Sequence, residues 1–283
     1  KASGGNGYRF FTPEMNEAAV ARLSLEHSLR EALEQGQFFL HYQPKIAMAD
    51  MKAVGVEALI RWQHPEIGMI PPGKFIPVAE ETGLIVPLGE WVMRAALAQI
   101  QDWRRRGFAP IPVAVNVSVR QIATPMFGER VFSLCQEYGV PPELLEIEIT
   151  ETAMMSNLAY IADTLNEIRG RGIRIAIDDF GTGYSSLSYL RRLPITTLKV
   201  DRSFVNEAPT NADTGAIAAT IIAMGRQLGL KVVAEGIETE EQLEFLRLHH
   251  CDELQGYFFS RPLPAGDLET RFLQPDGVLE VAG

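Results

Sequence analysis

Short apolar runs alternate with amphipathic stretches along most of the chain. The runs are rich in Val, Ile and Leu, as expected for buried strands, and they cover residues 38–44, 53–62, 111–118, 144–150, 173–179, 196–201, 231–236 and 252–256. Between them, apolar residues recur at helical spacing, for example at Ile161, Leu165 and Ile168. Eight strand-like runs separated by helices predict an α/β fold, either a barrel or a doubly wound sheet.

Helix boundaries are visible in the same pattern. Near the start, Leu25, Leu29 and Leu33 form one stripe, and Gly36 is expected to end that helix. Thr239 and Gln242 have the spacing of a capping box, which predicts the first turn of another helix.

The pattern covers the chain without an internal break, so we expect a single domain. A length of 283 residues is common for one α/β barrel. We predict a linker or the tail of an upstream domain at residues 1–17, the barrel at 18–270, and a C-terminal tail at 271–283.

Polar residues stand at or near the end of nearly every apolar run, where packing alone would favour an apolar residue. They are Glu57, Asn116, Glu148, Asp178, Asp179, Lys199, Glu235 and Gln255. In a barrel all these ends meet at one face, which is where the active sites of that fold are built. Each acid taken singly has an ordinary explanation as a helix cap or a solvated charge, but their repetition at one rim favours a functional site.

The residue types at this rim favour hard cations. Carboxylates with one amide, and neither His nor Cys, suit Mg²⁺ or Mn²⁺ better than zinc or copper. The adjacent Asp178 and Asp179 could supply a bridging and a terminal ligand to two ions, and Lys199 could position a water molecule or stabilise charge on phosphorus. The pattern therefore predicts metal-assisted hydrolysis of a phosphate ester.

Overall charge limits the substrate class. A formal net charge of -10 argues against binding to polymeric nucleic acid, whereas a small anion remains possible where a metal inverts the local field. No apolar stretch is long enough to cross a bilayer, and the two cysteines, Cys135 and Cys251, have no metal-binding spacing. We expect the domain to be cytoplasmic.

An ordered set of motifs covers nearly the whole chain. These are YQP at 42–44, EALIRW at 57–62, NVS at 116–118, EITE at 148–151, DDFGTGYSSLSYL at 178–190, LKVD at 198–201, AEGIE at 234–238 and QGYFFSRPLP at 255–264. In this order they closely resemble the EAL-domain phosphodiesterases. The resemblance implies a modified TIM-type (β/α)8 barrel whose first strand is antiparallel, and hydrolysis of cyclic di-GMP to linear pGpG.

The resemblance also implies roles at the rim. Ligands of two Mg²⁺ or Mn²⁺ ions would be Glu57, Asn116, Glu148, Asp178, Asp179 and Glu235, with Asp178 bridging the ions. Glu57, Lys199 and Glu235 correspond to catalytic positions: Lys199 matches a lysine that touches the nucleophilic water, and Glu235 a glutamate proposed as the base. No metal or water-contacting position departs from the family pattern.

Substrate and loop residues follow from the same resemblance. Substrate contacts are expected at Gln43, Leu59, Arg61, Asp201, Gln255 and Pro262, with Arg61 suited to phosphate by its forked donors. The segment 179–186 resembles a loop that couples metal binding to a homodimer interface. Its expected participants are Glu151, Phe180, Gly181 and Gly183.

The resemblance extends to the chain's surroundings. YRFFTPEMN at residues 8–16 is similar to the junction after a GGDEF domain, which implies upstream GGDEF and sensor domains. Two alternatives to a hydrolase remain at this point. One is a noncatalytic cyclic di-GMP receptor, and the other is a Mg²⁺-dependent barrel enzyme that acts on carbon acids.

Overall fold

The computed structural model describes residues 13–155, 158–183, 190 and 193–274. Most of the predicted linker and tail, much of the expected GGDEF junction, and residues 184–186 of the expected coupling loop therefore lie outside the described residues. The first described helix, α1, begins at Pro13, inside the stretch predicted as linker.

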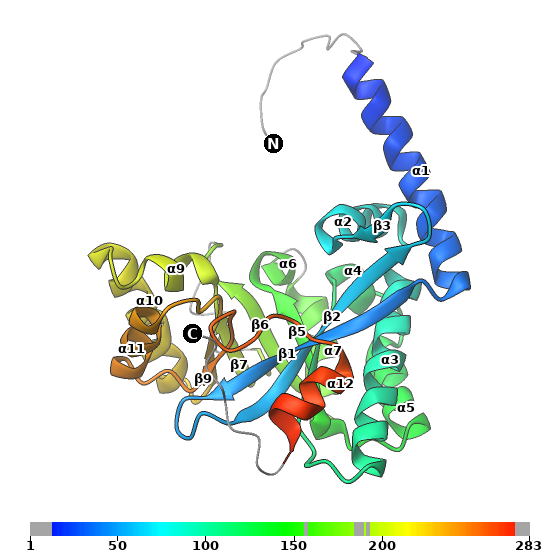
Figure 1. Cartoon of the computed structure of the whole chain (residues 1–283). Helices are drawn as coiled ribbons and strands as arrows, with labels where there is room; N and C mark the ends of the chain where they lie inside the picture. The colour runs from blue at the N-terminus through cyan, green and yellow to red at the C-terminus, as the bar shows by residue number, and fades with distance from the viewer. Residues whose placement is uncertain (1–12, 156–157, 184–189, 191–192, 275–283) are drawn as a thin grey trace.

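Eight of the strands in the described part of the chain close into a barrel (Figure 1). They are β1 (Phe38–Ala47), β2 (Ala53–His64), β4 (Val113–Asn116), β5 (Leu145–Thr150), β6 (Arg174–Phe180), β7 (Thr197–Val200), β8 (Lys231–Ala234) and β9 (Glu253–Leu254). Their order around the barrel is β1, β9, β8, β7, β6, β5, β4 and β2, and β2 pairs back to β1. All eight predicted strands are present, with ends that differ by at most three residues.

Strand β1 runs against both of its neighbours. It pairs antiparallel with β2, where Gln43 lies opposite Glu57, and antiparallel with β9, where Ile46 lies opposite Leu254. The other neighbouring pairs of the barrel are parallel. The barrel with an antiparallel first strand is thus confirmed. A short strand that the sequence did not indicate, β3 (Gly68–Ile70), extends β2 as a hairpin.

Helices surround the barrel. They are α1 (Pro13–Gln35), α2 (Pro72–Thr82), α3 (Ile85–Arg105), α4 (Val119–Ile122), α5 (Phe127–Glu137), α6 (Glu151–Met155), α7 (Leu158–Gly170), α9 (Arg202–Glu207), α10 (Ala212–Gln227), α11 (Glu240–Leu248) and α12 (Ala265–Leu268), with short 3₁₀ and π turns at Pro142–Leu144 and Glu269–Leu273. The capping box of α11 is present, because Gln242 N donates to Thr239 Oγ1 and Thr239 N donates to Gln242 Oε1.

Two apolar cores hold these elements together. The larger core lies between the barrel strands and the surrounding helices and includes the predicted stripe of α7 at Ile161, Leu165 and Ile168. The smaller core joins α1, α2 and α3 to the start of β1 and the end of β2, around Trp62 and Phe75. Because both cores use the outer faces of the strands, the inner faces are left for other residues.

The described helices include none that is both long and apolar enough to span a membrane. Cys135 and Cys251 are buried free thiols. Neither cysteine is part of the rim described next.

Candidate metal centre

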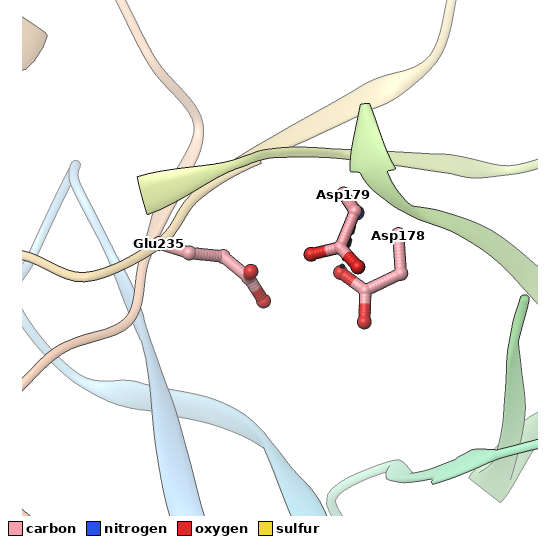
Figure 2. A group of neighbouring side chains, drawn as sticks. All are labelled: Asp178, Asp179 and Glu235. Carbon is pink, nitrogen blue, oxygen red and sulfur yellow. Dashed lines mark hydrogen bonds between the residues drawn. The ribbon is translucent and has the colours of Figure 1, made fainter. Parts of the chain in front are cut away.

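Three carboxylates converge at the mouth formed by the carboxyl ends of the parallel strands. Asp178 and Asp179 lie at the end of β6 and Glu235 follows β8, and Figure 2 shows Glu235 facing the two aspartates. One oxygen from each lies within 4.8 Å of the others. Among the described residues, this is the group of acidic, His or Cys side chains whose spacing could hold a metal ion.

Lys199 lies at the centre of a larger group of carboxylates. Its Nζ is 2.6 Å from Glu235 Oε1, 2.7 Å from Glu148 Oε2, 3.1 Å from Asp178 Oδ1 and 3.6 Å from Glu57 Oε2. Lys199 and Glu148 are fully buried, and Glu57 and Asp178 are nearly so. The structure therefore brings together predicted rim residues from β2, β5, β6, β7 and the end of β8.

Amide side chains hold Glu57 in place. Asn116 Nδ2 donates to Glu57 Oε1 at 2.7 Å, and Gln255 Nε2 donates to Glu57 Oε2 at 2.7 Å and to Gln43 Oε1 at 3.1 Å. Gln43 Nε2 in turn donates to the carbonyl of Ser260. The buried Gln255 Oε1 has no hydrogen-bond partner among the residues that the structure describes, so one acceptor at the rim is left for a further group.

Burial and mutual repulsion change the acidity of this site. Burial, with Asp178 and Glu57 nearby, raises the pKa of Glu235 to about 8 even though Lys199 opposes the change. Burial, Asp178 and Asp201 raise the pKa of Asp179 to about 6. Without a bound cation, Glu235 therefore keeps its proton at neutral pH, whereas Asp179 is mostly ionised.

For Glu148 and Lys199, neighbouring opposite charges outweigh burial and shift the pKa values toward the charged forms. Burial alone would raise the pKa of Glu148, but the nearby Lys199 and Lys45 lower it to about 2. Burial alone would lower the pKa of Lys199, but the surrounding carboxylates raise it well above its usual value. Both groups are therefore charged at neutral pH.

The donor set fits a hard divalent cation. It consists of carboxylate and amide oxygens, which Mg²⁺ and Mn²⁺ prefer. Burial, and after it the neighbouring carboxylates, raise the pKa values of Glu235 and Asp179, and a bound cation would favour the charged form of both groups. The unpartnered Gln255 Oε1 offers a further acceptor, for instance to a water molecule held by such an ion.

A second polar layer lies below the rim, and the sequence analysis missed it. Lys45 Nζ is 2.5 Å from Glu146 Oε1 and 2.7 Å from Glu148 Oε1, and Thr197 Oγ1 donates to Glu146 Oε2. Lys45, Glu146 and Thr197 are each two positions from a rim residue on the same strand. Because side chains at i and i+2 share one face of a strand, this spacing is the signal that would have found them.

The loop after β6 is fixed to the rim by Glu151. Gly181 N donates to Glu151 Oε2 at 2.8 Å. A Cβ on Gly183 would lie 2.8 Å from Glu151 Oε1, so the carboxylate leaves no room for a side chain there. Asp179 has a φ of 54°, an uncommon left-handed value outside glycine, and Phe180 is buried in the core. The end of β6 is thus bent where two candidate ligands lie.

Two hollows open at this mouth. The first is acidic, has a volume of about 400 Å³, and is lined by Asp178, Asp179, Glu235, Asp201, Glu238 and Tyr257, among others. The second is largely apolar, has a volume of about 300 Å³, and lies between the rim and helices α2 and α3. Leu59 lines both hollows, so the two adjoin.

The predicted substrate contacts divide between these hollows. Gln43, Asp201 and Gln255 line the acidic hollow, and Arg61 lines the apolar one. Asp201 also caps α9 by accepting a hydrogen bond from Ser203 N. Pro262 is not among the residues that line either hollow, although the structure describes it. Glu238, Tyr257 and Arg202 line the acidic hollow without having been predicted as contacts.

Comparison with known proteins gives consistent matches. A family model described as the EAL domain matches residues 26–262. MucR of Pseudomonas aeruginosa, a bifunctional diguanylate cyclase/cyclic di-GMP phosphodiesterase, is 47% identical over 268 residues, which are 95% of this chain and 39% of MucR. The cyclic di-GMP phosphodiesterase NbdA of the same organism is 44% identical over 269 residues, which are 95% of this chain and 34% of NbdA. The chain thus spans little more than a third of these curated relatives.

A solved structure agrees with these matches. The structure described as PaMucR phosphodiesterase in a c-di-GMP complex matches with a TM-score of 0.83 and 46% sequence identity. The match covers 87% of this chain and 99% of that one.

Proposed function

Because the chain belongs to the EAL domain family, we propose that it is a phosphodiesterase that hydrolyses cyclic di-GMP to linear pGpG with two divalent cations. The observation that carries the proposal is the convergence of Glu57, Glu148, Asp178 and Glu235 on Lys199 at one mouth of a closed barrel. The names of MucR and NbdA support the substrate, and so does the c-di-GMP complex of the PaMucR structure.

The proposed metal ligands are the oxygen donors of the rim. One ion would be held by Glu57, Asn116, Glu148 and Asp178. The other would be held by Asp178, Asp179 and Glu235. When bound, Mg²⁺ or Mn²⁺ would lower the pKa of a water molecule and neutralise charge on the phosphodiester. The short separation of the Asp178, Asp179 and Glu235 oxygens supports this assignment.

The chain's own residues orient and deprotonate the attacking water. Lys199 donates hydrogen bonds into the centre of the site and stabilises negative charge that develops on the phosphate oxygens. Glu235, as a carboxylate, accepts the proton of the water molecule. Water attacks phosphorus, the bond from phosphorus to the ribose oxygen breaks, that oxygen takes a proton from solvent, and the ring opens to the linear dinucleotide.

The two adjoining hollows suit an anionic ligand with flat bases. Arg61 is half-buried in the wall of the apolar hollow and binds phosphate, since its forked donors match phosphate oxygens. The apolar hollow lined by Leu59, Ile76 and Val92 has the size and character to take one guanine base. Gln43 and Gln255 then lie beside the phosphate at the rim.

The remaining assignments concern the whole protein. The chain spans only part of its curated relatives, and from the resemblance of the N-terminal junction we propose that GGDEF and sensor domains precede it in the full protein. We also propose a homodimer in which the contact of Glu151 with Gly181 couples the metal site to the interface. The cytoplasmic location stays a prediction.

The test is nucleotide chromatography after incubation with cyclic di-GMP. We expect pGpG in the presence of Mn²⁺ and none with EDTA. Glu57→Gln should lose this activity because it removes a charged metal ligand. Lys231→Met should keep it, because Lys231 begins β8 at the end of the barrel opposite the mouth. Cyclic di-GMP that stays intact with Mn²⁺ while binding to the protein would establish the receptor alternative instead.

A further inference from the structure

A buried chain of ion pairs leads from the mouth to Lys45 and Glu146, two residues that have no role in the proposed reaction. It runs from Lys199 through Glu148 to Lys45 and ends at Glu146. Lys45, Glu146 and Glu148 are all buried. Burying such charges costs several kcal/mol per ion unless each is well paired, so their arrangement calls for an explanation.

Glu148 is the link between the two layers. Its side chain is fully buried, and each carboxylate oxygen has a different ammonium partner at the same distance. Oε1 accepts from Lys45 at 2.7 Å, and Oε2 accepts from Lys199 at 2.7 Å. Since Lys199 also contacts Asp178 and Glu235, Oε2 is the oxygen that faces the mouth.

Lys45 reaches Glu148 from the antiparallel strand. Its neighbour Gln43, two positions earlier on β1, lies at the rim and accepts a hydrogen bond from Gln255. The side chain of Lys45 therefore enters the same interior one layer lower. Lys45 touches neither hollow of the mouth, so it contacts no reacting group.

We propose that Lys45 is a positioning residue that holds Oε1 of Glu148 and so presents Oε2 to a divalent cation in a fixed orientation. The inference rests on the proposed function, because it takes Glu148 as a metal ligand. Hydrogen bonds behind a ligand fix its orientation and make it a better donor, and their loss weakens metal binding.

A simpler role for Lys45 is to compensate the charge of Glu146, its other partner at 2.5 Å. The two roles predict different behaviour when Glu146 is neutralised as well. In the compensating role, Lys45→Met combined with Glu146→Gln restores the site. In the positioning role, the double variant remains defective because Oε1 of Glu148 still has no donor.

The experiment measures Mn²⁺ binding by isothermal titration calorimetry, without nucleotide, for the unaltered chain and three variants. Lys45→Met should raise the Kd for Mn²⁺ by about 10- to 100-fold. Glu146→Gln, which leaves the pair of Lys45 and Glu148 intact, should stay within about threefold of the unaltered chain, well below the loss expected for a ligand-orienting group. Lys45→Met with Glu146→Gln should recover thermal stability but keep the weakened binding.

Kinetics give a second readout. In Lys45→Met, activity lost at low Mn²⁺ should return as Mn²⁺ is raised to saturation, with an unchanged KM for cyclic di-GMP. The inference is overturned if Lys45→Met binds Mn²⁺ as tightly as the unaltered chain, if the double variant regains normal affinity, or if the unaltered chain binds no Mn²⁺. A chain that binds Mn²⁺ but does not cleave cyclic di-GMP would refute the proposed function alone, because the calorimetric comparison is independent of turnover.

Discussion

Replacement of Lys199 by methionine tests the contribution of Lys199 to the stability of the fold separately from its contribution to catalysis. Lys199 Nζ lies 2.6 to 3.6 Å from the carboxylates of Glu235, Glu148, Asp178 and Glu57. Methionine has a similar length but no charge, so Lys199→Met leaves these buried carboxylates without their common partner. We expect the metal-free variant to be much less stable than the unaltered chain.

The distances set the size of the effect. At an effective dielectric constant of about 20, Coulomb's law gives about 6 kcal/mol for the 2.7 Å pair with Glu148 and about 5 kcal/mol for the 3.6 Å pair with Glu57. Desolvation of the ammonium group offsets most of this sum, and the measured loss on breaking a buried pair is about 3–5 kcal/mol. At roughly 2–4 °C per kcal/mol for a domain of this size, the melting temperature should fall by about 6–20 °C.

Added Mn²⁺ should reverse much of this loss. A cation at the rim takes over the charge compensation that Lys199 provides, and without Lys199 it has no competing ammonium group. A ligand at 100 times its Kd stabilises a protein by about 2.7 kcal/mol. Because Mn²⁺ should bind the variant more tightly, we expect a larger Mn²⁺-dependent rise in melting temperature for Lys199→Met than for the unaltered chain. The variant should nevertheless be inactive, because the donor to the reacting phosphate is gone.

The assay is thermal unfolding followed by circular dichroism, with EDTA and with Mn²⁺. Lys231→Met is the matched control, because Lys231 pairs with Glu253 at 2.6 Å but its side chain is 45% exposed. Its removal should cost clearly less than that of Lys199, because Lys231 is partly exposed and pairs with a single carboxylate, that of the buried Glu253. The reasoning is refuted if metal-free Lys199→Met has the same melting temperature as the unaltered chain, or if Mn²⁺ raises both melting temperatures equally.

Two further predictions concern acidity and the loop after β6. Because protons compete with a cation for Glu235 and Asp179, whose pKa values are raised to about 8 and about 6, the affinity for Mn²⁺ should rise between about pH 6 and about pH 9. Calorimetry at several pH values checks this, and an affinity independent of pH would contradict it. Gly181→Ala should cost about 2 kcal/mol or more in urea unfolding, since Gly181 has a φ of 103° and a Cβ there would lie 2.6 Å from the ring of Phe204. Gly139→Ala, with a φ of 62° and open space around it, should cost only about 1 kcal/mol, and equal losses would show that the contact is unimportant.

The strands and the rim could be predicted from the sequence because both depend on local patterns. A polar residue that ends an apolar run, such as Asn116 or Asp178, differs from what packing requires, and the closed barrel brings such ends together. The antiparallel direction of β1 came from the resemblance to the EAL family alone, since apolar periodicity is the same for either direction.

The inner layer and the ion pairs could not be predicted in the same way. Lys45 and Glu146 lie within strands rather than at their ends. They therefore stand out from the pattern of a buried run less clearly than the polar residues that end such runs. Which carboxylate oxygen contacts Lys199 depends on side-chain rotamers and on distances between distant strands. Hairpin strand β3 was missed because Gly68–Ile70 is too short to show a period.

The brevity of β9 has a consequence for how the barrel responds to ligands. Glu253–Leu254 is the only segment that joins β8 to β1 within the described barrel, and it pairs through two residues on each side. We expect a seam this narrow to open more readily than the longer strand pairings of the barrel. Gln255, which donates to Glu57 at the rim, directly follows β9, so we expect order at the rim and pairing at the seam to favour each other. A ligand that orders the rim should therefore also stabilise the pairing of β9 with β1 and β8, which completes the ring of strands.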